Sequence, residues 1–195
     1  MHIRETILPW AEGGDRRLLT SIDFFTREIA RYGIAISLET DFQRFKALHR
    51  LIGKRPLTPN FDPDTSFLSH EDGFWMKGEN PSGQIVLTQA ARLYDCEIVS
   101  VAALHQSLQA FYTMPARHAE PGETCRSLAP AAHTLRGHVC YHGELWLAPA
   151  YRGLLLSDPV AKLLMAIVLF RWAPDYLFGM AQPGICTKGV AARYG

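Results

Sequence analysis

The chain has 195 residues, the size of one domain, and its 48% hydrophobic and 20% charged residues are typical of a globular protein. A formal net charge of +1 indicates neither a nucleic-acid-binding protein nor a polybasic membrane anchor. The most apolar run, residues 160–170, contains Lys162 and is shorter than the roughly 20 residues that span a bilayer. The N-terminus carries no apolar signal segment, so we expect a cytoplasmic protein without a membrane partner.

The cysteines are spread widely and form no Cys-x-x-Cys pair. In a chain without a secretion signal we expect them to be reduced, with no disulfide framework. They are Cys96, Cys125, Cys140 and Cys186.

The first 56 residues predict two helices with a strand between them. Asp15 is a good N-cap for a helix that ends at Gly33, where glycine favours a left-handed C-cap. Residues 34–39 (IAISLE) are rich in β-branched residues and predict a strand. Thr40 or Asp41 then caps a second helix. The apolar stripes of the two helices are Leu18, Ile22, Phe25 and Ile29 in the first, and Phe42, Phe45, Leu48 and Ile52 in the second.

The middle of the chain predicts a loop, a hairpin and an insertion. Residues 57–70 are rich in proline and aspartate, which favours a loop that covers the mouth of a site. A tight turn at 80–83 (NPSG) joins two strands, residues 74–78 and 85–90. Helical spacing over 99–112 predicts a helix, and the polar stretch after it makes 98–135 an insertion with one helix.

The last third predicts a strand over 138–147, a strand over 176–181 and a final helix over 183–193. Between the two strands, Ser157-Asp158-Pro159 predicts the start of a helix, with a cap followed by proline in the first turn. Taken together, the order of elements predicts an α/β (α+β) single domain, residues 1–195, with a mixed sheet.

The segment 143–157 (GELWLAPAYRGLLLS) runs from a strand through a tight turn into a helix start. Such a turn directs several backbone N–H groups and the positive end of the helix dipole toward one place. It therefore predicts a site for a phosphate or another anion.

This segment resembles the cofactor motif of the GNAT-type N-acetyltransferases, in which a strand ending Val-x-Pro-x-x-Arg-Gly leads into Arg-x-x-Gly-x-Gly/Ala and a helix. The order of the hairpin, the strand 176–181 and the final helix also follows that family, over about residues 34–195. The resemblance implies a mixed, mostly antiparallel sheet flanked by helices, with residues 1–33 as an N-terminal helical addition.

The resemblance further implies transfer of an acetyl group from acetyl-CoA to a primary amine, with acetyl-CoA lying where the strand 144–147 parts from the strand 176–181. Glu144 stands where some members place a general base. No metal is expected. The residues implied to hold the cofactor are Leu145, Trp146, Leu147, Arg152, Gly153, Leu154, Leu155, Leu156, Ser157 and Gln182.

The sequence departs from the motif at three places. Leu155 replaces the first motif glycine, with Ser157 at the second small residue; Asp158 adds a negative charge in the first helical turn; and Ala191 occupies the position of the family's tyrosine acid, for which Tyr194 is a poor substitute. These departures leave a second hypothesis open, a catalytically inactive GNAT-like binding or dimerisation module. The chain ends at Gly195, where the family continues into further strands. Either the chain is a truncated product, or a partner chain in a homodimer completes the sheet, or the resemblance overstates the fold.

One metal alternative also stays open. His138, Cys140 and His142 alternate along a predicted strand and face the same way, so they would bind zinc if Cys125 or His133 supplied a fourth ligand.

Overall fold

The computed structural model describes residues 3–7 and 15–180. Its centre is one five-stranded sheet in the order β1-β2-β3-β4-β5. The strands β1 to β4 pair antiparallel in succession, and β5 pairs parallel to β4. The predicted mixed, mostly antiparallel sheet is confirmed. The strands are β1 Ala35–Glu39, β2 Gly73–Glu79, β3 Ile85–Cys96, β4 Gly137–Leu147 and β5 Tyr176–Gly179.

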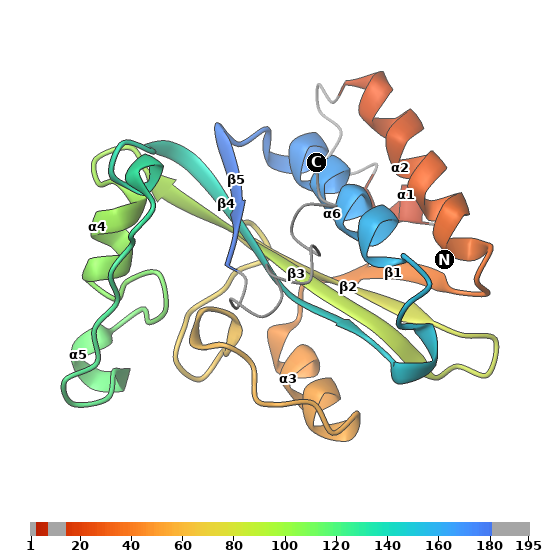
Figure 1. The fold of residues 1–195 in the computed structure, drawn as a ribbon, viewed down its shortest axis with the longest axis horizontal. Coiled ribbons are helices and arrows are strands. Elements are labelled where there is room, and N and C mark those ends of the chain that lie inside the picture. The colour runs from red at the N-terminus through yellow and green to blue at the C-terminus, as the bar shows by residue number, and fades with distance from the viewer. Residues whose placement is uncertain (1–2, 8–14, 181–195) are drawn as a thin grey trace.

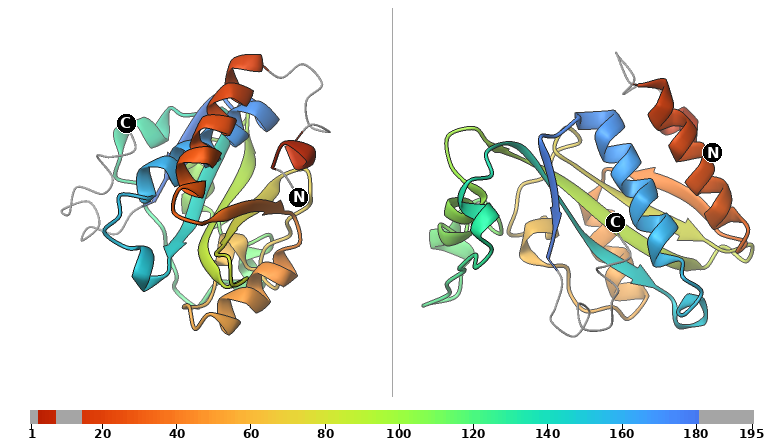
Figure 2. Two further views of the ribbon diagram at one scale, coloured as in Figure 1. Left: turned by 90° about the vertical axis from the view of Figure 1, so that its right-hand side faces the viewer. Right: turned by 45° about the horizontal axis from the view of Figure 1, so that its top comes forward.

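Helices cover both faces of the sheet (Figure 1). On one face lie α1 (Ile3–Ile7), α2 (Arg16–Ala30) and α6 (Ser157–Trp172), whose buried residues share one core cluster. On the other face α3 (Phe42–Leu51) and α4 (Val101–Gln106) share a second cluster. Figure 2 shows α2 and α6 side by side above the sheet.

The remaining helical segments are short. They are α5 (Pro115–His118) and the 3-10 turns Pro59–Phe61, Pro130–His133 and Pro149–Tyr151. Neither α1 nor α5 was expected from the sequence.

Strand alternation sorts the core residues between the two faces. Along β3, Leu87 and Ala91 join the cluster under α2 and α6, whereas Ala90 and Tyr94 join the cluster under α3 and α4. Because successive strand residues point to opposite faces and both faces are covered, nearly every residue of β3 is buried.

Local capping explains where most helices begin. Asp15 caps α2 and Asp41 caps α3, each accepting a backbone hydrogen bond from the first turn, so both predicted starts are confirmed. The predicted start of α6 at Ser157-Asp158-Pro159 is confirmed, but the side-chain cap expected there is absent. Ser157 is its first helical residue rather than its cap, and Leu156 at the cap position offers no side-chain acceptor.

The predicted helix 99–112 was wrong in extent. The helix ends at Gln106, since Leu108 adopts a left-handed conformation with φ +62° that a continuing helix does not allow. Gln182, Cys186, Ala191, Tyr194 and the predicted helix 183–193 lie outside the described residues.

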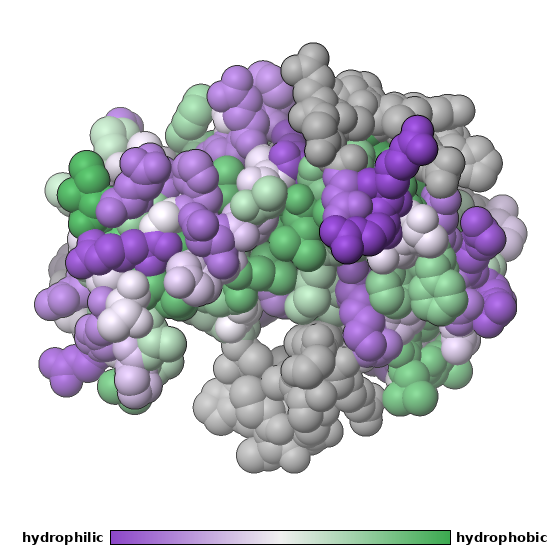
Figure 3. All heavy atoms as spheres, turned by 90° about the horizontal axis from the view of Figure 1, so that it is seen from above, coloured by the Kyte–Doolittle hydropathy of each residue, from purple (hydrophilic) through white to green (hydrophobic). Residues whose placement is uncertain are grey.

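Cys96, Cys125 and Cys140 are free thiols in the described part of the chain. Figure 3 shows hydrophobic and hydrophilic side chains interleaved over the face seen from above. No helix within residues 3–7 and 15–180 is both long enough and apolar enough to cross a bilayer. The division into a core domain with additions at 1–33 and 98–135 stays a prediction.

Candidate functional site

The strand β4 is distorted where the sequence places Glu144. The register with β3 shifts between Thr88 and Ala90, which pair with Trp146 and Gly143, so β4 carries an extra residue there. Glu144 itself has φ +57°, a left-handed conformation. A β-bulge of this kind bends a strand and changes the direction of its side chains.

The described pairing of β4 with β5 ends close to the same place. Their parallel pairing runs from Val139 with Tyr176 to His142 with Gly179 and ends there, two residues before Glu144. The part of β4 that follows the bulge contains Leu145, Trp146 and Leu147, each half-buried. The predicted separation of the two strands after this point is therefore compatible with the pairing that the described residues show.

The carboxylate of Glu144 is buried and fully engaged. Its Oε1 accepts hydrogen bonds from the Thr58 amide at 2.9 Å and the Thr58 hydroxyl at 2.8 Å. Its Oε2 accepts from Lys54 Nζ at 2.8 Å. The side chains of Glu144 and Lys54 are 0% and 9% exposed, so the ion pair is shielded from water.

These contacts set the charge state of Glu144. Burial alone raises the pKa of its carboxyl, but the Lys54 ammonium and the hydrogen bonds from Lys54 and Thr58 outweigh it and lower the pKa below its ordinary value. An ionised carboxylate held in this way is a weak proton acceptor. Its predicted part as a general base stays a prediction, and its contacts favour a different part.

A neighbouring histidine completes this cluster. Lys54 Nζ lies 3.4 Å from His49 Nε2, and His49 Nδ1 lies 3.3 Å from the Arg55 carbonyl. Burial and the adjacent Lys54 charge lower the pKa of His49 to about 4, so it is neutral at pH 7. With Nδ1 donating to Arg55, Nε2 is free to accept from Lys54.

The turn after β4 carries a run of unpaired backbone donors. The amides of Gly153, Leu154, Leu155, Leu156 and Ser157 donate no hydrogen bond within the described part of the chain. The amide of Asp158 is the first to find a partner, the Leu155 carbonyl at 3.2 Å. Since α6 also has no side-chain cap, its positive end is left open to an anionic ligand.

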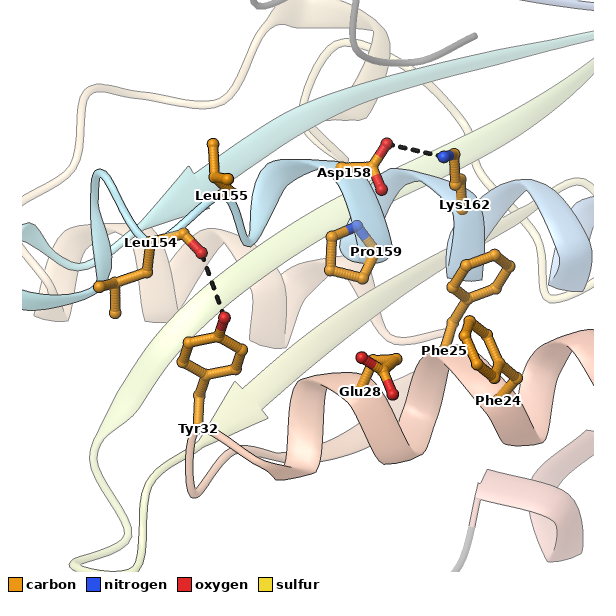
Figure 4. A pocket seen from close by; sticks show the side chains of 9 residues that line it. All are labelled: Phe24, Phe25, Glu28, Tyr32, Leu154, Leu155, Asp158, Pro159 and Lys162. Carbon is orange, nitrogen blue, oxygen red and sulfur yellow. Dashed lines mark hydrogen bonds and ion pairs between the residues drawn. The ribbon is translucent and has the colours of Figure 1, made fainter.

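Leu155 adopts a backbone conformation that glycine favours. It has φ +59°, in the left-handed region where glycine is favoured, and Gly153 nearby has φ +80°. The Leu155 side chain is 61% exposed. Figure 4 shows it pointing away from Tyr32, on the edge of the groove that it lines together with Leu154 and Asp158.

The turn borders a groove of about 680 Å³ between α2 and α6. Tyr32, at the end of α2, donates a hydrogen bond to the Leu154 carbonyl at 3.4 Å and so ties α2 to the turn. Asp158, which the sequence marked as an unfavourable charge, forms an ion pair of 2.9 Å with Lys162 one turn along α6. Arg152 donates from Nε to the Leu147 carbonyl and holds the turn to the end of β4.

The metal alternative finds no support in the geometry. Within the described residues no three His, Cys, Asp or Glu side chains gather around one point. His138 is exposed, whereas Cys140 is buried in the core under α6. Cys125 and His133 border a separate cavity beside α4.

The sequence did not reveal Lys54 and Thr58 as parts of this site. They precede Glu144 by 90 and 86 residues, and a lysine after a helix is ordinarily a solvated surface residue. Gln89 was missed as well: it is fully buried opposite the bulge, with its Nε2 3.3 Å from His142 Nδ1 and its Oε1 unpartnered. Gln182, the remaining predicted cofactor residue, lies outside the described residues.

No protein-family model matches this chain, and no curated protein matches it either. Solved structures do resemble it. A predicted acetyltransferase with acetyl-CoA from Clostridium acetobutylicum is 16% identical, with a TM-score of 0.44 over 83% of this chain and 88% of that one. A Trypanosoma brucei acetyltransferase is 9% identical, with a TM-score of 0.40 over 82% and 90%.

Glucosamine-6-phosphate N-acetyltransferase from Arabidopsis thaliana is 8% identical, with a TM-score of 0.39 over 80% of this chain and 90% of that one. At these identities the likeness concerns the fold alone. In this chain four antiparallel strands are followed by one parallel pair, β4 with β5, which α6 connects. This topology agrees with the GNAT-type acetyltransferase fold expected from the sequence.

Proposed function

We propose that this protein is an acyl-CoA-dependent N-acyltransferase that moves an acetyl group from acetyl-CoA to a primary amine. The observation that carries the proposal is the run of unpaired amides from Gly153 to Ser157 at the uncapped start of α6. Amide donors and a helix N-terminus together favour a phosphate group. The strand that leads into this turn is β4, whose last described pair with β5 is His142 with Gly179, before the bulge.

The residues present fit the pyrophosphate of CoA. Gly153 to Ser157 would hold it through main-chain N–H groups. Leu145, Trp146 and Leu147 would line the pantetheine arm along β4.

In the reaction the amine nitrogen forms a bond to the acyl carbon, the carbon–sulfur bond breaks, and the ammonium proton passes to a base or to water. The loop 57–70 would border the acceptor amine, and the protein would act in the cytoplasm.

Calorimetry tests the cofactor half of the proposal. CoA should bind the wild-type protein more tightly than pantetheine, which lacks the pyrophosphate. Leu155→Gly should strengthen CoA binding, because the backbone can then approach a phosphate more closely. The proposal is lost if neither the wild type nor Leu155→Gly binds CoA.

A second candidate function is a CoA-binding module without catalysis, or a dimerisation module. The engaged carboxylate of Glu144 favours it, because the predicted base is held by Lys54 and Thr58. Release of free CoA thiol from acetyl-CoA with a panel of primary amines separates the two. Thiol release that depends on an amine supports the enzyme, and CoA binding without any release supports the module.

A further inference from the structure

The buried carboxylate of Glu144 connects segments that are far apart in the sequence. It joins the bulge of β4 to residues 54–58, the connection that follows α3. The Glu144 carbonyl also accepts from Lys54 Nζ at 3.2 Å and from the Thr88 hydroxyl of β3 at 3.2 Å. Side chain and main chain of one residue are therefore both fixed by the same neighbours.

We infer that Glu144 is a positioning residue: with Lys54 and Thr58 it fixes the bulge of β4 and thereby the course of the strand toward the anion-binding turn. We call these three residues the latch. The inference that the latch shapes β4 stands on the contacts, and its consequence for acyl transfer rests on the proposed function.

Each proton of the Lys54 ammonium and each oxygen of the Glu144 carboxylate has a hydrogen-bond partner within the latch or beside it. The three protons of the Lys54 ammonium go to Glu144 Oε2, the Glu144 carbonyl and His49 Nε2. Two donors of Thr58 fill Glu144 Oε1. A buried charge pair is stable in place only when such further hydrogen bonds complete it. Here they do, and all of them act at the bulge.

The backbone of Glu144 explains what the latch has to hold. A left-handed conformation is unfavourable for a residue with a Cβ and persists where surrounding contacts enforce it. Glu144 lies two residues beyond the last pair of β4 with β5. When the latch is removed, this part of β4 is free to return to an extended conformation, and the strand changes direction between the bulge and residues 153–157.

The matched control is Lys46 on α3. It forms ion pairs with Asp62 and Asp64 at 2.6 Å and is 15% exposed, but it makes no contact with Glu144. Lys54→Met and Lys46→Met both remove a mostly buried lysine from an ion pair, and only the first opens the latch. Thr58→Val is the milder variant if Lys54→Met does not fold, since it removes one hydrogen bond and keeps the shape.

Hydrogen exchange of the full chain measures the result. We expect the amides of residues 143–148 to exchange about tenfold faster or more in Lys54→Met or Thr58→Val, with Lys46→Met like the wild type there. Equal exchange of this segment in the Lys54→Met and Lys46→Met proteins, or in Thr58→Val and the wild type, overturns the inference. This readout needs no ligand, so it decides the latch even if CoA fails to bind and the proposed function falls.

Kinetics supplies the second readout for an active protein. Glu144→Gln keeps the size and shape of the side chain, and removes the charge and one of the two accepting oxygens. If Glu144 is a positioning residue, we expect kcat to fall by less than about tenfold and KM for acetyl-CoA to rise. If Glu144 is a general base, we expect kcat to fall by about 100-fold or more with KM unchanged. The second result would contradict the assignment of Glu144 as a positioning residue.

Discussion

Replacing Leu155 by glycine should stabilise this protein. A left-handed conformation costs a residue with a Cβ about 1–2 kcal/mol, and Leu155 has φ +59°. Its side chain is 61% exposed, so little buried apolar surface is lost with it. Against this gain, glycine adds about 0.4–1 kcal/mol of conformational freedom to the unfolded chain. The net expectation is a gain of about 0.5–1 kcal/mol in the free energy of unfolding.

Thermal and urea unfolding of Leu155→Gly measure this difference, which corresponds to an increase of about 1–4 °C in Tm for a chain of this size. Leu154→Gly is the matched control. Leu154 has no positive φ and is 42% exposed, so glycine there loses packing and adds unfolded-chain freedom. We expect that control to lose about 1–2 kcal/mol. If both variants lose stability to the same extent, the argument from backbone strain at Leu155 is wrong.

Further predictions concern the buried pair, the core and the thiols. Lys54→Met should lower the free energy of unfolding by about 3–5 kcal/mol, because it leaves the Glu144 carboxylate buried without its partner; a loss below about 1 kcal/mol in urea unfolding would contradict this. Because the folded-state pKa of Glu144 is lowered, its stabilisation is present above the unfolded value of about 4.3 and is lost as pH falls through the folded value. The stability of Glu144→Gln should therefore depend less on pH than that of the wild type in the range below the unfolded value, and parallel profiles of the two proteins would count against this. Gly78→Ala should lower the free energy of unfolding by about 1–3 kcal/mol, because an added Cβ would lie 2.6 Å from Cγ2 of Ile34. An unchanged Tm would refute this close approach. Burial raises the pKa of the Cys140 thiol, whereas Cys125 is only half-buried, so iodoacetamide should modify Cys125 before Cys140. Equal rates for these two thiols in peptide mass spectrometry would contradict the packing described.

The parts of the fold that local signals determine were predictable from the sequence. Asp15 and Asp41 cap helices because a carboxylate satisfies amides within its own first turn. The hairpin turn at residues 80–83 and the strand 138–147 follow from equally local patterns. Where the pattern did not decide, prediction failed: residues 99–112 have helical spacing, but the left-handed Leu108 ends the helix early.

The candidate site was predictable only in part. The turn proposed to bind an anion, residues 153–157, is a contiguous segment, so the sequence could propose its residues together. The partners of Glu144 were not, because Lys54 and Thr58 reach it only when α3 packs beneath the sheet. A single strand residue such as Glu144 looks the same in sequence whether it faces solvent or a buried ammonium. Its environment, and with it the direction of its pKa, exists only in the folded chain.

The central claim is that the amides of Gly153 to Ser157 receive the phosphates of CoA. A titration of the ¹⁵N-labelled protein with CoA, followed by NMR, tests it most directly. We predict that these five amide resonances shift together with those of residues 145–147, and that pantetheine shifts the second group without the first. Saturable CoA binding that leaves all five amides of the turn unmoved would contradict the claim.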